Sequence, residues 1–247
     1  MKSPSRRSPL PFVLVNMAIS ADGKIATANR TVSSFGSKRD RDHLLELRAT
    51  ADAVMAGART ADLNPINMGP GPEKYRRLRR KRGLAECNLR VVVTRSGSLD
   101  PNARIFAYDF SPIIILTTRS APKAALDRLR ERGAEVHVSG QQEIDFARAL
   151  LWLRKQWKIK RLLCEGGGEL NQALFRAGLV DELHLTICPR IIGGRVAPTI
   201  ADGLGVPSLS RARQFRLHAF KRAGGELFAV FRAVPRAVRH FPAALRR

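Results

Sequence analysis

Short apolar runs alternate with segments of helical periodicity along most of the chain. Runs rich in Val, Ile and Leu predict strands at residues 11–18, 51–56, 89–94, 112–118, 134–138, 160–164 and 182–188. Helical spacing predicts helices at residues 37–48, 73–84, 122–132, 143–157 and from 168 onward, with Ser37 as an N-cap and a short turn or helix at 59–60. Two last strands, at 215–220 and 227–234, flank a Gly-Gly turn. This order predicts one α/β domain with a mostly parallel sheet flanked by helices and an antiparallel C-terminal hairpin.

One predicted strand-to-helix turn holds three consecutive glycines, at residues 166–168. Glycine lets the backbone come close to a ligand, and the first N–H groups of a helix have no partner inside it. The helix dipole adds partial positive charge at the same end, so the turn suits a phosphate. A short glycine motif by itself is equally consistent with a turn that only packs a helix tightly on a sheet.

Polar clusters follow several predicted strands, at residues 20–24, 57–60 and 165–169, and Thr94 follows another. Ligands of open α/β sheets bind at the carboxyl ends of the strands, so these clusters are predicted to meet in one crevice. Lys24 and Arg48 are cations placed to meet a phosphate, Arg48 through a bidentate contact. Glu165 is placed to accept hydrogen bonds from an amino-substituted ring or a sugar. For each residue taken alone a surface charge or a cap is the preferred interpretation, whereas the whole set favours a site.

The chain of 247 residues carries a formal net charge of +23, which invites a nucleic-acid function. Much of this charge falls in a block at residues 74–82, predicted to be a solvated basic helix, and in the two ends. We expect residues 1–9 to be a disordered basic tail, 10–234 the folded domain and 235–247 a second basic tail. Aromatic residues do not alternate with the basic ones as a stacking platform requires. Nonspecific polyanion binding is therefore expected, and nucleic-acid binding as the function is the weaker alternative.

Several other classes lack their sequence signals. The chain has no apolar run of about 18 residues, and its first residues lack the apolar stretch of a signal peptide, so we expect no membrane association. Its three widely spaced cysteines fit a reducing cytoplasm. The histidines lack metal-ligand spacing, and His184, in an apolar strand, is interpreted as structural. No nucleophile elbow, P-loop or zinc-deaminase signature is present, and no metal is expected.

Three segments together carry a family resemblance. They read NMAISADGKIA at 16–26, LLELRATADAVMAGARTADLNP at 44–65 and LLCEGGGELNQALFRAGLVDELHLTICPRIIGG at 162–194. The chain resembles the reductase domain of the riboflavin-biosynthesis enzymes, which has a dihydrofolate-reductase-like fold. The last segment is the most specific, because the glycines, a helix, AGLVDEL and CPRIIGG occur in that order. The resemblance covers nearly the whole predicted domain.

The resemblance implies that NADPH reduces the ribosyl side chain of a 5-amino-6-(5-phosphoribosylamino)pyrimidine to ribityl, and it leaves open whether the pyrimidine is deaminated. The cofactor supplies the hydride, so no protein nucleophile is expected. The implied cofactor contacts are Thr60, Thr94, Gly166, Gly167, Gly168, Glu169 and Leu170. The implied substrate contacts are Asp22, Lys24, Arg48 and Glu165, with Asp22 helping to form the turn of the first loop. We expect Lys24, or a water beside it, to assist catalysis by supplying a proton and stabilising charge.

The chain departs from the family pattern in two places. Asn64 stands before Pro65, where the family often has an acidic residue, and the nearest carboxylate is Asp62. The loop that often carries Ser and Trp reads TVSSFG at 31–36, which puts its substrate contacts in question. No deaminase-like segment precedes the match, so we expect a stand-alone reductase of this pathway or a related dihydrofolate-reductase-like NADPH reductase of unknown substrate.

Three further questions stay open in the sequence: the substrate class, the oligomeric state and the choice between NADPH and NADH. A related reductase acting on a pterin is an alternative, and it requires a carboxylate in the middle of the first helix, where Asp42 and Glu46 are available. The resemblance implies a homodimer, with the C-terminal strands presenting an edge. The preference for NADPH over NADH rests on the resemblance and on the surplus of arginines able to meet a 2′-phosphate.

Overall fold

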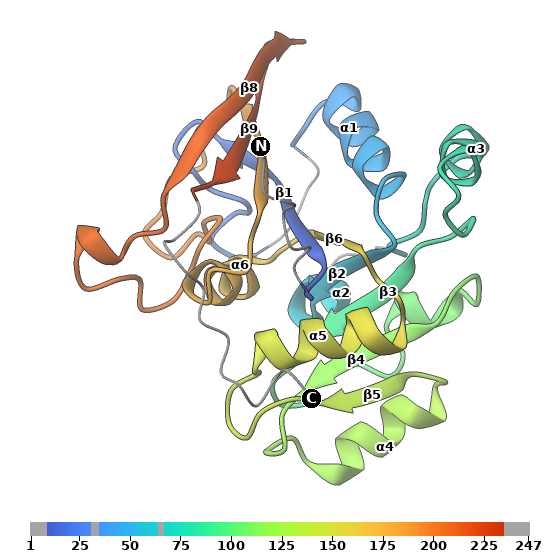
Figure 1. Cartoon of the computed structure of the whole chain (residues 1–247). Helices are drawn as coiled ribbons and strands as arrows, with labels where there is room; N and C mark the ends of the chain where they lie inside the picture. Colours follow the sequence, from blue (N-terminus) through green and yellow to red (C-terminus); the bar gives the residue numbers. More distant parts are fainter. Residues whose placement is uncertain (1–8, 31–34, 64–66, 235–247) are drawn as a thin grey trace, which may run out of the picture.

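The computed structural model describes residues 9–30, 35–63 and 67–234. Their strands form one nine-stranded sheet with the order β5-β4-β3-β2-β6-β1-β7-β9-β8 (Figure 1). Strands β1 to β7 pair in parallel, and β9 pairs antiparallel with both β7 and β8. The strands are β1 (Phe12–Ser20), β2 (Ala53–Gly57), β3 (Leu89–Val93), β4 (Ile113–Thr117), β5 (Glu135–Val138), β6 (Arg161–Cys164), β7 (Glu182–Cys188), β8 (Phe215–Ala223) and β9 (Glu226–Ala233). The predicted fold class is confirmed.

The helices described are α1 (Lys38–Arg48), α2 (Ala58–Leu63), α3 (Glu73–Lys81), α4 (Lys123–Glu131), α5 (Phe146–Gln156) and α6 (Gly168–Arg176). Two 3₁₀ turns, η1 (Arg104–Ala107) and η2 (Leu209–Arg211), were not predicted. Ser37 is the N-cap of α1, because its side chain accepts from the N–H groups of Arg39 and Asp40. The predicted ends of the elements differ from the observed ones by a few residues, since caps and packing decide the last turn.

The central parallel strands β1, β2, β3, β4 and β6 are buried on both faces, as parallel strands covered by helices should be, whereas β8 at the edge is exposed. Successive residues of a strand point to opposite faces, so Val13 and Val15 of β1 join one core cluster while Leu14 joins the other. Helices α5 and α6 contribute to the first cluster, and α1, α2 and α4 contribute to the second. Trp152 and Trp157 pack against the first cluster, in line with the core or cover role expected of them.

The prediction of a wholly solvated basic helix at 73–84 is wrong for Arg79, which is fully buried in α3. Its guanidinium donates to the carbonyl oxygens of Arg48 and Ala51 at 2.7 and 2.6 Å, and to that of Ala85 at 2.7 Å. The last carbonyls of a helix have no partner inside it, so a buried guanidinium satisfies them. Arg79 thus holds the end of α1, the point from which Arg48 reaches toward the sheet.

The expected basic tails, apart from Pro9, lie outside the described residues, as do Asn64, Pro65 and most of the TVSSFG loop. Among the residues that the structure describes, no helix is long and apolar enough to cross a membrane. The same residues contain no group of three or more side chains placed to hold a metal ion.

Candidate functional site

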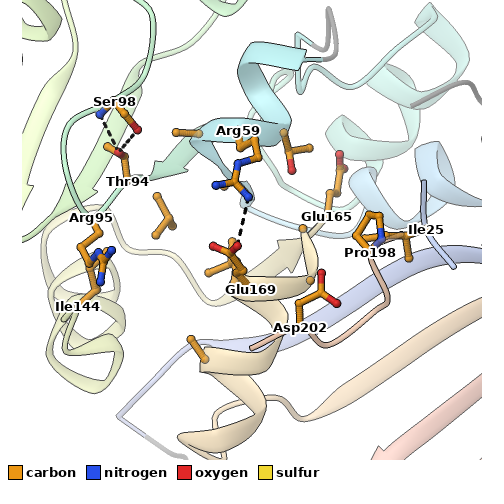
Figure 2. A pocket seen from close by; sticks show the side chains of 18 of the residues that line it. Ile25, Arg59, Thr94, Arg95, Ser98, Ile144, Glu165, Glu169, Pro198 and Asp202 are labelled. Carbon is orange, nitrogen blue, oxygen red and sulfur yellow. Dashed lines mark hydrogen bonds and ion pairs between the residues drawn. The ribbon is translucent and has the colours of Figure 1, made fainter. Parts of the chain in front are cut away.

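A cleft of about 500 Å³ opens beyond the carboxyl ends of β2, β3 and β6 (Figure 2). Its walls come from four parts of the chain: the loop after β1, the start of α2, the residues after β3 and the start of α6. Residues just before α5 and the segment at 198–202 complete the lining. The polar clusters predicted to meet in one crevice therefore lie around one cleft, although not every member faces it.

The glycine turn forms the floor at the start of α6. Gly167 is the N-cap and offers no side-chain cap, and the first N–H bonded within the helix is that of Asn171, to the Gly167 carbonyl at 3.0 Å. Gly166 has a φ of +82°, and a Cβ there would lie 2.8 Å from the Met17 sulfur. A Cβ on Gly168 would lie 2.3 Å from the carbonyl oxygen of Thr199. The turn is closely packed from behind, and its free N–H groups suit an anion.

The other implied cofactor residues also lie at the cleft. Residues 167–170 line it together with Thr60 and Thr94, whereas Gly166 lies behind the surface and accepts from the Gly57 N–H at 2.8 Å. The Thr94 hydroxyl accepts from the N–H of Ser98 at 3.0 Å and so closes the turn after β3 (Figure 2). Thr94 therefore forms part of the cleft wall, and its hydroxyl is already hydrogen-bonded within the turn that follows β3.

The contacts of Arg48 differ from the expectation that it meets a phosphate. Its Nε and Nη2 donate to the two oxygens of Glu165 at 2.6 and 2.7 Å, and its Nη1 donates to the Gly69 carbonyl at 2.7 Å. Arg48 is buried and does not line the cleft, whereas Glu165 does. The predicted bidentate contact exists, but its partner is a carboxylate of the same chain. Because Arg48 takes both oxygens in a charge-assisted pair, it holds the Glu165 side chain in one orientation.

Asp22 and Lys24 lie in the loop after β1, beside the cleft rather than in its lining. The Asp22 carboxylate accepts from the Ser20 hydroxyl at 2.5 Å and from the N–H groups of Gly193 and Ile192 at 2.7 and 3.1 Å. These bonds, the Ser20 one first, lower the pKa of Asp22 to about 2. Lys24 donates to the Ala197 carbonyl at 3.0 Å. Asp22 is thus engaged in holding the turn, as the resemblance implied.

The segment at 197–202 joins that first loop to α6 and was missed in the sequence. The N–H of Ile25 donates to the Pro198 carbonyl at 2.9 Å, and the side chain of Asn171 donates to the Ile200 carbonyl at 2.9 Å. The N–H of Asp202 donates to the Gly168 carbonyl at 3.1 Å, and its carboxylate accepts from Thr199. Asp202 itself lines the cleft. No sequence motif marks this segment. Its partners lie in distant parts of the chain or bond it through backbone groups, which are the same for every residue type.

Three arginines of the lining were not singled out in the sequence: Arg30, Arg95 and Arg59, although Arg59 lies within the predicted cluster at 57–60. Arg59 forms an ion pair with Glu169 at 3.1 Å, and Arg95 forms one with Glu143 at 3.1 Å. Arg59 precedes Thr60 and Arg95 follows Thr94, so their places next to two singled-out threonines at strand ends were a usable signal.

The carboxylates that a pterin reductase requires are not at the cleft. Asp42 accepts from the Tyr75 hydroxyl at 2.6 Å, and Glu46 pairs with Arg39 at 2.9 Å. Neither lines the cleft, so the geometry gives that alternative no support.

The fold and the cleft define the class of protein: an α/β domain in which a glycine turn at the start of a helix lines a ligand cleft. Solved structures share this fold. A pyrimidine reductase-like protein from Corynebacterium diphtheriae has a TM-score of 0.79 at 22% identity, covering 92% of this chain and 93% of that one. A riboflavin biosynthesis reductase, Rib7, from Saccharomyces has a TM-score of 0.68 at 14% identity, covering 93% of both chains.

Sequence comparison then identifies the family. The family described as RibD C-terminal domain matches residues 11–227. A 2,5-diamino-6-ribosylamino-4(3H)-pyrimidinone 5′-phosphate reductase from Methanothermobacter thermautotrophicus is 33% identical over 228 residues, covering 90% of this chain and 97% of the relative. The enzyme of the same name from Archaeoglobus fulgidus is 33% identical over 220 residues, covering 89% and 96%. The chain belongs to the RibD C-terminal domain family, which confirms the resemblance.

A reductase of this family implies a nicotinamide cofactor, and the residues at the cleft fit one. The free N–H groups of residues 168–170 suit phosphate oxygens, and Arg59 and Arg95 place cations at two points of the lining. A volume of about 500 Å³ is within the range of cofactor sites.

Proposed function

We propose that this protein is an NADPH-dependent reductase that converts the ribosyl group of 2,5-diamino-6-ribosylamino-4(3H)-pyrimidinone 5′-phosphate to ribityl. The observation that carries the proposal is the cleft where the glycine turn and Glu165 meet, in a chain that matches reductases of this name over about nine-tenths of its length. The substrate keeps its 2-amino group in this proposal, because three relatives matched over 96–97% of their own length carry that name. The chain matches only 51% of the RibD protein of Chlamydia muridarum.

The cofactor supplies the hydride, and the protein supplies binding and alignment. The N–H groups of Gly168, Glu169 and Leu170 hold the diphosphate, and Thr60 lies beside them. Arg95 follows β3 together with Ser96, so a cation and a hydroxyl meet a 2′-phosphate there. The presence of Arg95 and Ser96 at this point is the reason to propose NADPH rather than NADH.

The substrate lies between Glu165 and the loop after β1. Glu165, held by Arg48, accepts hydrogen bonds from the amino groups of the pyrimidine, and Arg48 acts as a positioning residue. Lys24 would meet the 5′-phosphate or supply the proton taken up when C1 of the opened ribose is reduced. Asp22 keeps this loop in place through its three hydrogen bonds.

The C-terminal hairpin supports the further proposal of a homodimer. Strand β8 is an edge strand, and Figure 1 shows it standing away from the helices with β9. Leu217 and Phe220 of β8 are 59% and 64% exposed, and Leu227 of β9 is 38% exposed. A second copy covers these side chains and the free strand edge. Light scattering of the wild type and a Phe220→Glu variant tests this, and a monomeric wild type would contradict it.

We place the enzyme in the cytoplasm, since its three cysteines are free and none needs an oxidising compartment. Nucleic-acid binding as the function is disfavoured by the cleft, whose lining includes four carboxylates, Glu143, Glu165, Glu169 and Asp202. Nonspecific polyanion binding by the basic surface stays a prediction.

The test is NADPH oxidation with the diamino substrate and with its deaminated analogue, followed by titration with NADPH and NADH. Gly167→Asp is the negative control, because it adds a negative charge at the start of α6 and crowds the Thr60 hydroxyl, 3.3 Å from the new Cβ. We expect the wild type to turn over the diamino compound and to bind NADPH more tightly than NADH. We expect the variant to lose both turnover and nucleotide binding. A wild type that binds neither dinucleotide would refute the proposal. An Arg95→Gln variant with unchanged NADPH preference would remove Arg95 from the 2′-phosphate site.

A further inference from the structure

An ion pair closes over the start of α6. Arg59 Nη1 lies 3.1 Å from Glu169 Oε1, and Figure 2 shows the two side chains pointing toward one another across the cleft. Arg59 is in the first turn of α2, directly after β2, and Glu169 is in the first turn of α6. Both residues line the cleft, so the pair lies where a ligand must enter to reach the N–H groups of the glycine turn.

The fold does not depend on this pair. The side chains of Arg59 and Glu169 are 59% and 67% exposed, and pairs this exposed stabilise a protein only slightly. The backbone already joins the two elements, because the N–H of Gly57 donates to the Gly166 carbonyl at 2.8 Å. Little is lost when the guanidinium exchanges its carboxylate for another anion.

The charge of Glu169 conflicts with the anion site that its own backbone helps to form. Its N–H belongs to the group that suits a phosphate, while its carboxylate places a negative charge beside that group. A diphosphate at the same place repels the carboxylate and attracts the guanidinium. An arginine fork pairs with phosphate oxygens as readily as with a carboxylate.

We propose that Arg59 is a ligand of the cofactor diphosphate and that the Glu169 carboxylate holds its guanidinium until the phosphate replaces it. The inference rests on the proposed function, since it takes the cleft as a dinucleotide site. It assigns opposite effects to the two partners of one ion pair. Arg59 strengthens binding, and the Glu169 side chain weakens it.

The test measures the dissociation constants of NADPH and NADH by cofactor fluorescence for the wild type, Arg59→Gln and Glu169→Gln. We expect Arg59→Gln to weaken both nucleotides by about tenfold, with a smaller salt dependence. We expect Glu169→Gln to tighten both by roughly two- to fivefold, because the competing ion pair and the repulsion are gone. NADPH and NADH respond alike because they share the diphosphate.

The matched control is Asp127→Asn on α4, which makes the same change in net charge. Asp127 is paired with Lys123 and Arg130 at 2.5 and 2.8 Å and does not line the cleft. Circular dichroism checks that each variant is folded. Glu169→Gln that binds no more tightly than the control, or Arg59→Gln with wild-type affinity, overturns the inference while the wild type still binds. A wild type that binds neither nucleotide instead overturns the proposed function, and the inference with it.

Discussion

Replacing Gly168 by Ala tests whether the glycine turn and the segment at 197–202 act as one packed unit. A Cβ at this position would lie 2.3 Å from the Thr199 carbonyl oxygen and 2.6 Å from a carboxylate oxygen of Asp202. The first distance is about 1 Å inside van der Waals contact, and its partner is backbone that cannot rotate away. Either the start of α6 or the segment at 199–202 has to move.

The magnitude follows from two opposing effects. Crowding of a packed site costs about 1–3 kcal/mol, while replacing glycine by alanine in a helix gains up to about 1 kcal/mol. The cost of crowding exceeds the gain, and the net loss of about 1–2 kcal/mol in the free energy of unfolding lowers the Tm of a chain of this length by roughly 2–8 °C. Displacement of the N–H groups of the turn also weakens NADPH binding by about tenfold or more.

Thermal unfolding and NADPH titration of Gly168→Ala check both numbers, with Gly167→Ala as the control. Gly167 has a φ of −72°, and its nearest neighbour is the Thr60 hydroxyl, at 3.3 Å, which can rotate. The control should therefore stay near wild type in stability. Gly168→Ala with wild-type Tm and wild-type NADPH affinity would refute the claim that this turn is packed against the 197–202 segment.

Three other expectations concern the buried Arg79, the pH dependence of stability, and Lys24 in the first loop. Arg79→Met removes the donor to four carbonyl groups, two of which keep a bond from Asn88, so we expect urea unfolding to show a loss of about 2–4 kcal/mol. The pKa of His43 is lowered from 6.5 to about 4, chiefly by burial, so the unfolded chain binds the proton more readily and the free energy of unfolding falls as the pH drops from about 6.5 to 4. The pKa of Glu182 is lowered from 4.5 to about 2, first by its hydrogen bond with His184, so a further loss follows between about pH 4.5 and 2. Lys24→Ala should lower kcat by about a hundredfold at saturating substrate and leave NADPH binding unchanged.

Each of these has an outcome that contradicts it. Arg79→Met with an unchanged urea midpoint would mean that solvent reaches those carbonyls. His43→Gln should remove the loss of stability between pH 6.5 and 4, and a variant with the wild-type pH profile would exclude His43 as its source. Full turnover of Lys24→Ala at saturating substrate would remove Lys24 from catalysis.

The role of Arg48 shows why part of the site was beyond sequence reasoning. Arg48 and Glu165 are separated by 117 residues: Arg48 ends α1 shortly before β2 begins, and Glu165 directly follows β6. Their pairing depends on β6 lying next to β2 rather than elsewhere in the sheet. Apolar periodicity indicates that a strand is buried but does not indicate which strand is its neighbour, so the arginine was assigned to a phosphate.

The basic composition was equally ambiguous. Arg79 belongs to the arginine-rich block at 74–82 and looks like its neighbours in the sequence, yet it is fully buried while Arg77 is exposed. The difference comes from the carbonyls of Arg48 and Ala51, at and just beyond the end of α1, which only the packing of α3 against that end brings within reach. Net charge alone cannot separate a structural arginine from a solvated one.

By itself the sequence determined the α/β class, the positions of its strands and helices, the glycine turn and the family, because these follow from local periodicity, turn chemistry and ordered motifs. The tertiary structure decided which side chains face the cleft and which are already engaged. It paired Arg48 with Glu165, bonded Asp22 to the N–H of Gly193, brought Asp202 to the start of α6 and paired Arg59 with Glu169. These contacts join parts of the chain that only the order of strands in the sheet brings together, and that order is a property of the whole fold rather than of any segment.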